Sequence, residues 1–200
     1  HGAPFAASTL KPGQTYLFHY PFVATPCFLI NLGQAVGPGG PLETASGEQY
    51  RWPGGTGPGN SIVAFSAICS HKMTHPARSV SFINYRPETI SYTTSNNQRA
   101  EGKHLIYCCS ERSVYDVRDG ARVLGGPADQ PLTAIGLEHD AASDSLYATG
   151  TYGGEMYEQF FARFTNRLQL EYGITEVDAE VDSETVVENI ESFTDSQVLC

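Results

Sequence analysis

The sequence lacks several features that would assign it directly to a class of protein. No run approaches the roughly eighteen apolar residues that a membrane helix needs. Positive charge is scarce, with 12 Lys and Arg against 22 Asp and Glu. Eight of those acids follow Tyr172, where no Lys or Arg occurs, so the remainder has 14 acidic against 12 basic residues. Because a basic surface is missing, nucleic acid is not expected as a partner.

Cysteine is also scarce, since five residues at irregular spacing are too few for a disulfide scaffold. The sequence has no phosphate-binding loop, dinucleotide fingerprint or Ser-His-Asp order, which disfavours an independent hydrolase or dehydrogenase. Its start, His1–Leu10, has neither an initiator methionine nor the charged and apolar regions of a signal peptide. Either a leader or anchor was removed, or the start is arbitrary. The first case predicts a periplasmic or otherwise exported protein, associated with a membrane through such an anchor.

Short apolar or alternating runs fill the chain from Leu10 to about Gly150, separated by breaks rich in Pro, Gly and Asn. Runs such as TPCFLINLG, SIVAFSAIC and HLIYCC have the length and pattern of strands. The fold class that this pattern predicts is all-β, an antiparallel β-sandwich or barrel over residues 1–152.

The pattern changes after Gly153. Met156, Phe160 and Phe164 recur at four-residue steps, which predicts a helix that packs on the β domain. The acidic remainder is predicted to hold a short helix at Ser183–Phe193 or to be a mobile tail. We therefore expect a second part, residues 153–200, made of a C-terminal helix and an acidic tail.

Two short boxes carry the side chains with metal-binding chemistry. The first reads C-S-H, Cys69 to His71, and the second reads C-C-S-E, Cys108 to Glu111. A thiolate and an imidazole one residue apart on a loop can reach a common metal centre, and a second such loop supplies the rest of a four-ligand set.

These boxes resemble those of the Rieske 2Fe–2S family, in which C-x-H and C-x-x-H motifs hold the two irons. Box two of that family continues into a segment that Ser113, Tyr115 and Asp116 match, and a Pro- and Gly-rich cover follows, matched by Gly125–Pro131. The similarity spans about residues 61–151. It implies a Rieske-like fold, a 2Fe–2S cluster ligated by Cys69, His71, Cys108 and Glu111, and hydrogen bonds from Ser113 and Tyr115 to its sulfurs.

Glu111 is the main departure, because it stands where the family has its second histidine. A carboxylate in place of an imidazole adds one negative charge, which should lower the reduction potential. Three alternatives remain open: Cys109 is the fourth ligand, His75 or His104 moves in to bind iron, or the cluster is lost and the fold serves as a protein-interaction module.

Two further departures concern the loops. The quinol-oxidising members of the family join the boxes by a disulfide, and the corresponding residues here are Thr74 and Ser110, so the resemblance implies no such bridge. The interval between His71 and Cys108 is also longer than in the family, which predicts an inserted β-hairpin near the cluster, where a redox partner could dock.

The remaining cysteines and the first residue have other interpretations. Cys27 lies on an apolar strand and is predicted to be a small buried hydrophobe. Cys200 is either a free thiol or a disulfide partner. A third, less favoured hypothesis makes the protein a copper protein that uses the amine and ring of His1.

Together these residues predict one-electron transfer through a Rieske-like 2Fe–2S cluster. The chain would act as a subunit or partner of a larger redox complex and not as an independent enzyme. The expected partner is a redox protein, such as a membrane cytochrome, a quinol-oxidising complex or the large subunit of an oxidoreductase.

Overall fold

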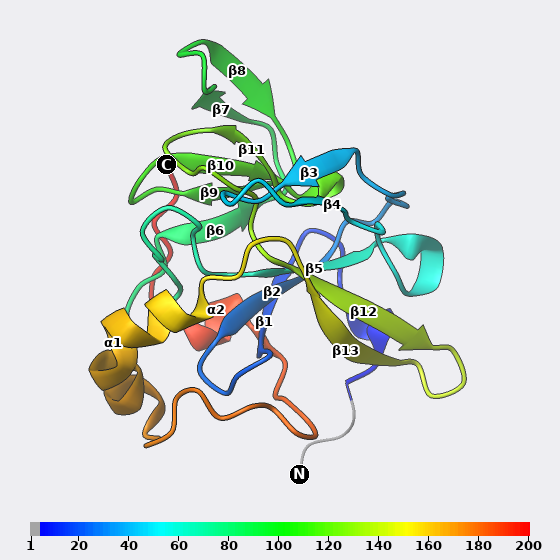
Figure 1. Ribbon diagram of the computed structural model, residues 1–200. Coiled ribbons are helices and arrows are strands. Elements are labelled where there is room, and N and C mark those ends of the chain that lie inside the picture. Colours follow the sequence, from blue (N-terminus) through cyan, green and yellow to red (C-terminus); the bar gives the residue numbers. More distant parts are fainter. Residues whose placement is uncertain (1–4) are drawn as a thin grey trace.

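The computed structural model describes residues 5–200, so the His1 hypothesis lies outside the described residues. Two antiparallel sheets form the body of the molecule (Figure 1). The larger has the order β13-β12-β5-β2-β1-β14, with the bounds Ser145–Tyr152, Ala134–Asp140, Ile62–Ser66, Pro26–Asn31, Thr15–His19 and Glu188–Asn189. The smaller has the order β11-β10-β9-β6, with the bounds Arg122–Gly125, Ser113–Asp116, Leu105–Cys108 and Ile83–Arg86.

Two hairpins and short 3₁₀ turns complete the β part. The hairpins are β3–β4 (Pro41–Glu43 and Gln49–Arg51) and β7–β8 (Ile90–Thr93 and Arg99–Gly102). The turns are η1 (Ala7–Thr9), η2 (Pro58–Asn60) and η3 (Val117–Asp119). The prediction of an all-β, antiparallel architecture is confirmed. Within residues 5–200 both main sheets are open, so the fold is a sandwich and not a closed barrel.

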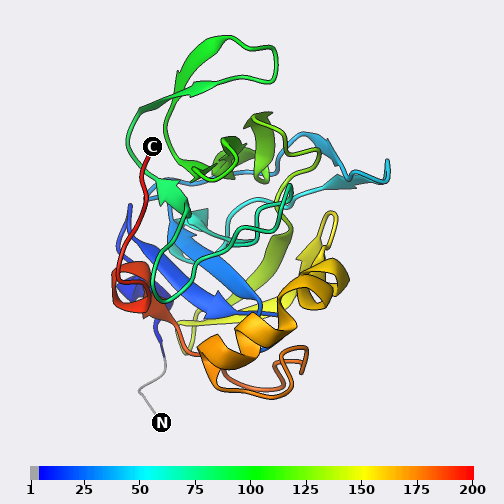
Figure 2. The ribbon, with the colours of Figure 1, turned by 90° about the vertical axis from the view of Figure 1, so that its left-hand side faces the viewer.

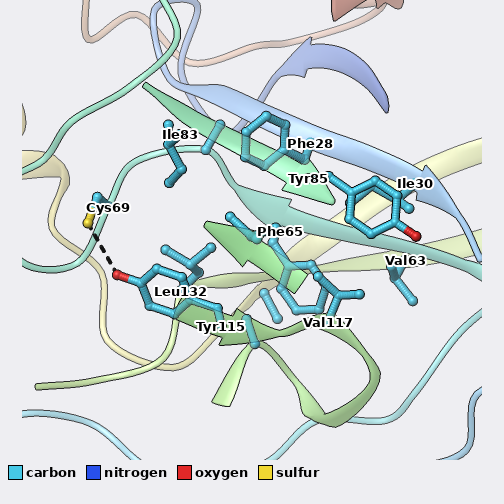
Figure 3. Close-up of a cluster of buried hydrophobic side chains, with 14 of the residues drawn as sticks. Phe28, Ile30, Val63, Phe65, Cys69, Ile83, Tyr85, Tyr115, Val117 and Leu132 are labelled. Carbon is cyan, nitrogen blue, oxygen red and sulfur yellow. Dashed lines mark hydrogen bonds between the residues drawn. The ribbon is translucent and has the colours of Figure 1, made fainter. Parts of the chain in front are cut away.

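The core fills the space between the two sheets. Phe28 and Phe65 from the larger sheet and Ile83 and Tyr115 from the smaller one belong to the same buried cluster (Figure 3). Strands β2 and β5 are buried on both faces, because a second apolar cluster that includes Leu29 covers their other side. Burial on both faces explains why these two strands are near-continuous apolar runs in the sequence.

Helix α1 (Tyr157–Tyr172) confirms the predicted apolar stripe. Its Phe160 and Leu168 are buried in a cluster with Ile68 and Met73, which lie in the chain that follows β5. The helix ends at Gly173, whose φ of 65° is the left-handed conformation that glycine adopts most readily at a helix end. α1 therefore packs directly on the segment that contains box one.

The acidic tail is docked on the β part and is not a mobile extension. Residues 188–189 form β14, which pairs with β1, and the predicted helix at Ser183–Phe193 is only the four-residue α2 (Ile190–Phe193). α2 lies against β1 (Figure 2). Ile190 and Phe193 enter the main core between the sheets. No helix in residues 5–200 is both long and apolar enough to cross a membrane.

The long interval between the boxes contains the predicted hairpin and one strand more. Strand β6 joins the smaller sheet beside β9, and β7–β8 then projects away from the body at the top of Figure 1. Ser95 N–H, in the turn of this hairpin, donates to Leu124 O at 3.2 Å. The hairpin is thus attached to the small sheet, which carries box two.

The docking of the tail can be tested by removing a buried side chain. Phe193→Ala should lower the free energy of unfolding by about 3–5 kcal/mol, the usual cost of deleting a core phenylalanine. Val186→Ala, in the same tail but 75% exposed, should change it by less than about 0.5 kcal/mol. Urea unfolding measures both. Equal small effects would show that the tail contributes nothing to the core.

Candidate metal centre

Two turns of the same type carry the four predicted ligands. In box one, in the loop after β5, Met73 N–H donates to Cys69 O at 2.9 Å. In box two, between β9 and β10, Arg112 N–H donates to Cys108 O at 2.7 Å. Met73 and Arg112 adopt positive φ values of 62° and 61°. Each turn therefore begins at its cysteine and ends in the left-handed conformation four residues later.

The turns bring the two cysteines together. Both side chains are fully buried, and the thiols of Cys69 and Cys108 lie close enough to shift each other's pKa. The hydroxyl of Tyr115, which extends from β10, is 3.2 Å from Cys69 Sγ (Figure 3). The hydroxyl of Thr74 lies close enough to Cys108 to oppose slightly the rise of its pKa. Two sulfurs and two hydroxyls thus meet in one enclosed place.

The contact makes Cys69 the more acidic thiol. Hydrogen bonds, first from Cys108 and then from Tyr115 and the backbone of His71, lower the pKa of Cys69 to about 6, against the opposing effect of burial. The same contact with Cys69, together with burial, raises the pKa of Cys108. At neutral pH the site therefore favours one thiolate, and a cation is needed to stabilise a second thiolate beside it.

His71 and Glu111 form the outer side of the site. His71 Nδ1 is 3.4 Å from Glu111 Oε2, and their side chains are 28% and 21% exposed. Lys72 Nζ lies 3.5 Å from the same carboxylate oxygen and is more exposed than either. The imidazole and the carboxylate, which come from different boxes, therefore meet as the two thiols do, but nearer the solvent.

Two buried polar atoms in the site lack partners. Among the described residues, Ser113 Oγ has no hydrogen-bond partner, and His71 Nδ1 has only the 3.4 Å approach of Glu111 Oε2, which lacks hydrogen-bond geometry. The Ser113 hydroxyl lies close enough to Cys69 to contribute slightly to its lowered pKa, although it makes no hydrogen bond of standard geometry. Buried hydroxyls and imidazoles are normally satisfied. An acceptor or a metal in this place would satisfy both atoms, so the residues present fit a sulfide-bridged iron cluster.

The predicted cover lies over both boxes. Ser70 Oγ donates to Gln130 O at 2.7 Å and lies 3.0 Å from the Tyr115 hydroxyl, which links the cover to box one. Gly126 has a φ of 83°, and a Cβ at this position would lie 2.5 Å from Ser113 Cα. Only glycine permits so close an approach. The cover is therefore built to exclude water from the thiols.

The donor set is not arranged for a single metal ion. In the part of the chain from residue 5 onward, no three His, Cys, Asp or Glu side chains gather around one point. A two-iron cluster needs only two protein ligands for each iron. The resemblance assigns Cys69 and Cys108 to one iron and His71 and Glu111 to the other, and this ligand set remains a prediction.

The structure does not bring the other candidate ligands to this place. Cys109 forms a disulfide with Cys200, so the hypothesis that Cys109 is the fourth ligand is wrong for this oxidised form, and Cys200 is a disulfide partner. His104 precedes β9, at the end opposite Cys108, and its Nδ1 is 2.7 Å from the Tyr85 hydroxyl.

His75 is directed away from the site. Its ring lies edge-on to Phe160 and Phe164 of α1, and its Nδ1 is 2.9 Å from Met73 O. Burial lowers the pKa of His75. The prediction for Cys27 is confirmed, because it is a buried thiol on β2, and burial raises its pKa.

Three residues of the site were not identified from the sequence. Ser70 and Lys72 flank His71, and Thr74 was considered only as a missing bridge position. Ser70 is the variable residue of the C-x-H box, so the motif does not predict its hydrogen bond to Gln130 in the cover. The contact of Lys72 with Glu111 depends on how the two turns face each other, which no spacing in either box reveals.

Comparison with known proteins gives a partial likeness. No protein-family model matches the sequence. Among solved structures, the chain is similar to the soluble domain of the Rieske protein II (soxF) from Sulfolobus acidocaldarius. The sequence identity is 26%, the match covers 71% of each chain, and the TM-score is 0.48.

The role of the tyrosine can be tested by a thiol titration. Tyr115→Phe removes a hydrogen bond that lowers the pKa of Cys69, so that pKa should rise above about 6 and the thiolate fraction at pH 7 should fall. Absorbance of the thiolate at about 240 nm, followed against pH in the iron-free protein, measures it. Tyr107→Phe, a buried tyrosine on β9, is the control and should leave the titration unchanged. An unaltered pKa in Tyr115→Phe would refute the assigned role.

Proposed function

We propose that this site holds a 2Fe–2S cluster and that the protein transfers one electron at a time between redox proteins. Cys69 and Cys108 would bind one iron, and His71 and Glu111 the other. When bound, such a cluster supplies a one-electron redox couple whose potential depends on its charge and hydrogen bonds. The proposal thus assigns the ligands that the sequence resemblance implies to the side chains of this site.

The observation that carries the proposal is the meeting of the boxes in two pairs. Two buried thiols lie close enough to shift each other's pKa, and an imidazole and a carboxylate from the same two boxes lie 3.4 Å apart. A structural core has no need of an acidic thiol, and thiolates are the ligands that iron–sulfur clusters use. The orphaned Ser113 hydroxyl supports it further, because a cluster sulfide is an acceptor for such a donor.

The charged and polar side chains near the site would determine whether the reduction potential of the cluster is raised or lowered. Glu111 adds a negative charge relative to an imidazole ligand, which favours the oxidised state. Lys72, 3.5 Å from that carboxylate, offsets part of this charge. The Tyr115 hydroxyl, 3.2 Å from Cys69 Sγ, would donate to this sulfur once it is an iron-bound thiolate, which favours the reduced state. We therefore expect the reduction potential to be lower than that of a two-histidine site. The decrease should be smaller than one uncompensated negative charge would cause.

The outer pair would be the place of electron exchange. His71 and Glu111 are the exposed members of the proposed ligand set, whereas the thiols are buried. A redox partner would dock at this edge, beside the small sheet that also carries β7–β8. The candidate partners are a membrane cytochrome, a quinol-oxidising complex or an oxidoreductase large subunit. The Cys109–Cys200 disulfide supports an exported location, since disulfides persist in oxidising compartments.

A second candidate function is a protein-interaction module without a cluster. The contact between Glu111 and Lys72 favours it, because the carboxylate already has a cationic partner other than iron. The two functions differ in whether the purified protein contains iron and inorganic sulfide.

The cluster is tested first by its cysteine ligands. The protein should be red-brown, with about two irons per chain and a reduced-state electron paramagnetic resonance signal. Cys69→Ser should abolish colour and iron binding, because a hydroxyl replaces the thiolate. Cys27→Ala, a buried cysteine away from the site, should keep both. A colourless protein with no iron after anaerobic purification would contradict the cluster and support the interaction module.

The fourth ligand is tested by Glu111→His. A second imidazole removes one negative charge from the iron, so the midpoint potential should rise and the reduced spectrum should move toward that of a two-histidine cluster. Lys72→Gln is the matched control, since it removes the neighbouring charge without changing a ligand and should lower the potential. Film voltammetry and electron paramagnetic resonance measure both. A potential unaffected by Glu111→His would show that Glu111 does not bind iron.

A further inference from the structure

The last residues of the chain form a strap along the interval between the boxes. Asp195 N–H donates to Arg78 O, Ser81 N–H donates to Ser196 O, and Val198 N–H donates to Ser81 O, each at 2.8 Å. Residues 195–200 are therefore bound to the segment from Arg78 onward by main-chain hydrogen bonds. The C-terminus lies beside the small sheet in Figure 1.

Side chains of β6 hold the rest of the strap. Asn84 Nδ2 donates to Val198 O at 3.0 Å, and Arg86 Nη1 donates to Cys200 O at 2.9 Å. Asn84 is almost fully buried, so its bond to the strap replaces water at that place. The strap ends in the disulfide between Cys200 and Cys109, whose Cα atoms are 5.8 Å apart.

This disulfide is attached to box two at the residue next to a proposed ligand. Cys109 directly follows Cys108, and its N–H donates to Phe82 O at 2.7 Å. Within residues 5–200 it is the only covalent tie on either box, because Thr74 and Ser110 cannot form a bridge between them. The residue after Cys108 is thus tied to a segment 91 residues away, in addition to the pairing of Cys108 itself with Ser113 and Ile83 in the small sheet.

The disulfide is more accessible than the site. Cys200 is exposed and Cys109 is half-buried, whereas Cys69 and Cys108 are fully buried. A small dithiol or a dithiol protein can reach Cys200 without contacting the two thiols that lie in the core. Exposed disulfides of this kind are the ones that exchange with external thiols.

We propose that residues 195–200 are a redox-releasable strap, which holds box two closed while the disulfide is formed and frees it when a dithiol reductant opens the disulfide. In the first step a thiolate of the reductant bonds to one sulfur of the pair and the other leaves as a thiolate. The second thiol of the reductant then closes its own disulfide. Two electrons and two protons pass to Cys109 and Cys200. The significance for cluster retention rests on the proposed function, but the strap itself does not.

The test compares thiol reactivity in the full chain after removal of iron by a chelator. The double variant Cys109→Ser/Cys200→Ser and the wild type have the same three free cysteines, 27, 69 and 108. Alkylation by iodoacetamide, assigned by mass spectrometry, reports how often each becomes accessible. Cys27, buried on β2 away from the strap, reports global unfolding. Leu199→Ala is the control variant, since it alters the strap but keeps the disulfide.

In the double variant, alkylation of Cys69 and Cys108 should be at least ~10-fold faster than in wild type, while Cys27 is unchanged, because only local opening is released. Wild type treated with dithiothreitol should behave as the double variant does, and Leu199→Ala as untreated wild type. Unchanged rates at Cys69 and Cys108 would overturn the proposal. An equal acceleration of all three thiols would also overturn it, since the disulfide would then stabilise the whole fold and not box two.

The same samples separate this proposal from the cluster. If the wild type as purified contains no iron or sulfide, the proposed function fails while the alkylation result still decides the strap. If it contains a cluster, iron release during dithiothreitol treatment should be faster than in untreated protein by a similar factor. Iron release that is independent of the disulfide would show that the strap does not control the site.

Discussion

The contact between the Cys69 and Cys108 turns is the constraint on which the rest of the site depends. Each turn alone is a short loop that ends in a left-handed residue, and contacts within one turn would not bury its thiol. In the folded protein the two thiols lie close enough to shift each other's pKa, and Cys69 and Ser70 are hydrogen-bonded to Tyr115. The sandwich supplies this geometry because the chain after β5 of the larger sheet leads to Cys69, while β9 of the smaller sheet ends at Cys108, and both cysteines belong to the core between the sheets.

Polarity is graded across the site from the core to the solvent. The thiols lie deepest, the imidazole and carboxylate are half-exposed, and Lys72 reaches the solvent. This order places the soft thiols where water is excluded and a charged pair where solvent screens it. A buried Glu111 would cost far more to desolvate. The arrangement explains how a carboxylate can stand where a neutral ligand is expected without destabilising the fold.

The scaffold uses distant parts of the chain to hold these turns. Helix α1 packs on the segment that follows β5, the β7–β8 hairpin is attached to β11, and the tail adds β14, α2 and the strap. The tail is rich in acidic residues but also contains a few apolar ones. Two of these, Ile190 and Phe193, are buried in the core. The net charge of this segment suggests a mobile tail, but the burial of two apolar side chains docks it on the β part.

The sequence alone determined what depends on local pattern: the alternating strands, the stripe of α1, the two boxes and the glycine-rich cover. The strands and the stripe follow from periodicity, which neighbouring residues set, whereas the roles of the boxes and of the cover are what the resemblance to the Rieske family implies. The tertiary structure decided which cysteines meet. Cys108 and Cys109 are adjacent and chemically identical, yet Cys108, the last residue of β9, is buried in the core with Cys69, whereas Cys109, the first residue of the turn, is bonded to Cys200. That choice, and the contact of Lys72 with Glu111, arise only when segments distant in sequence pack together.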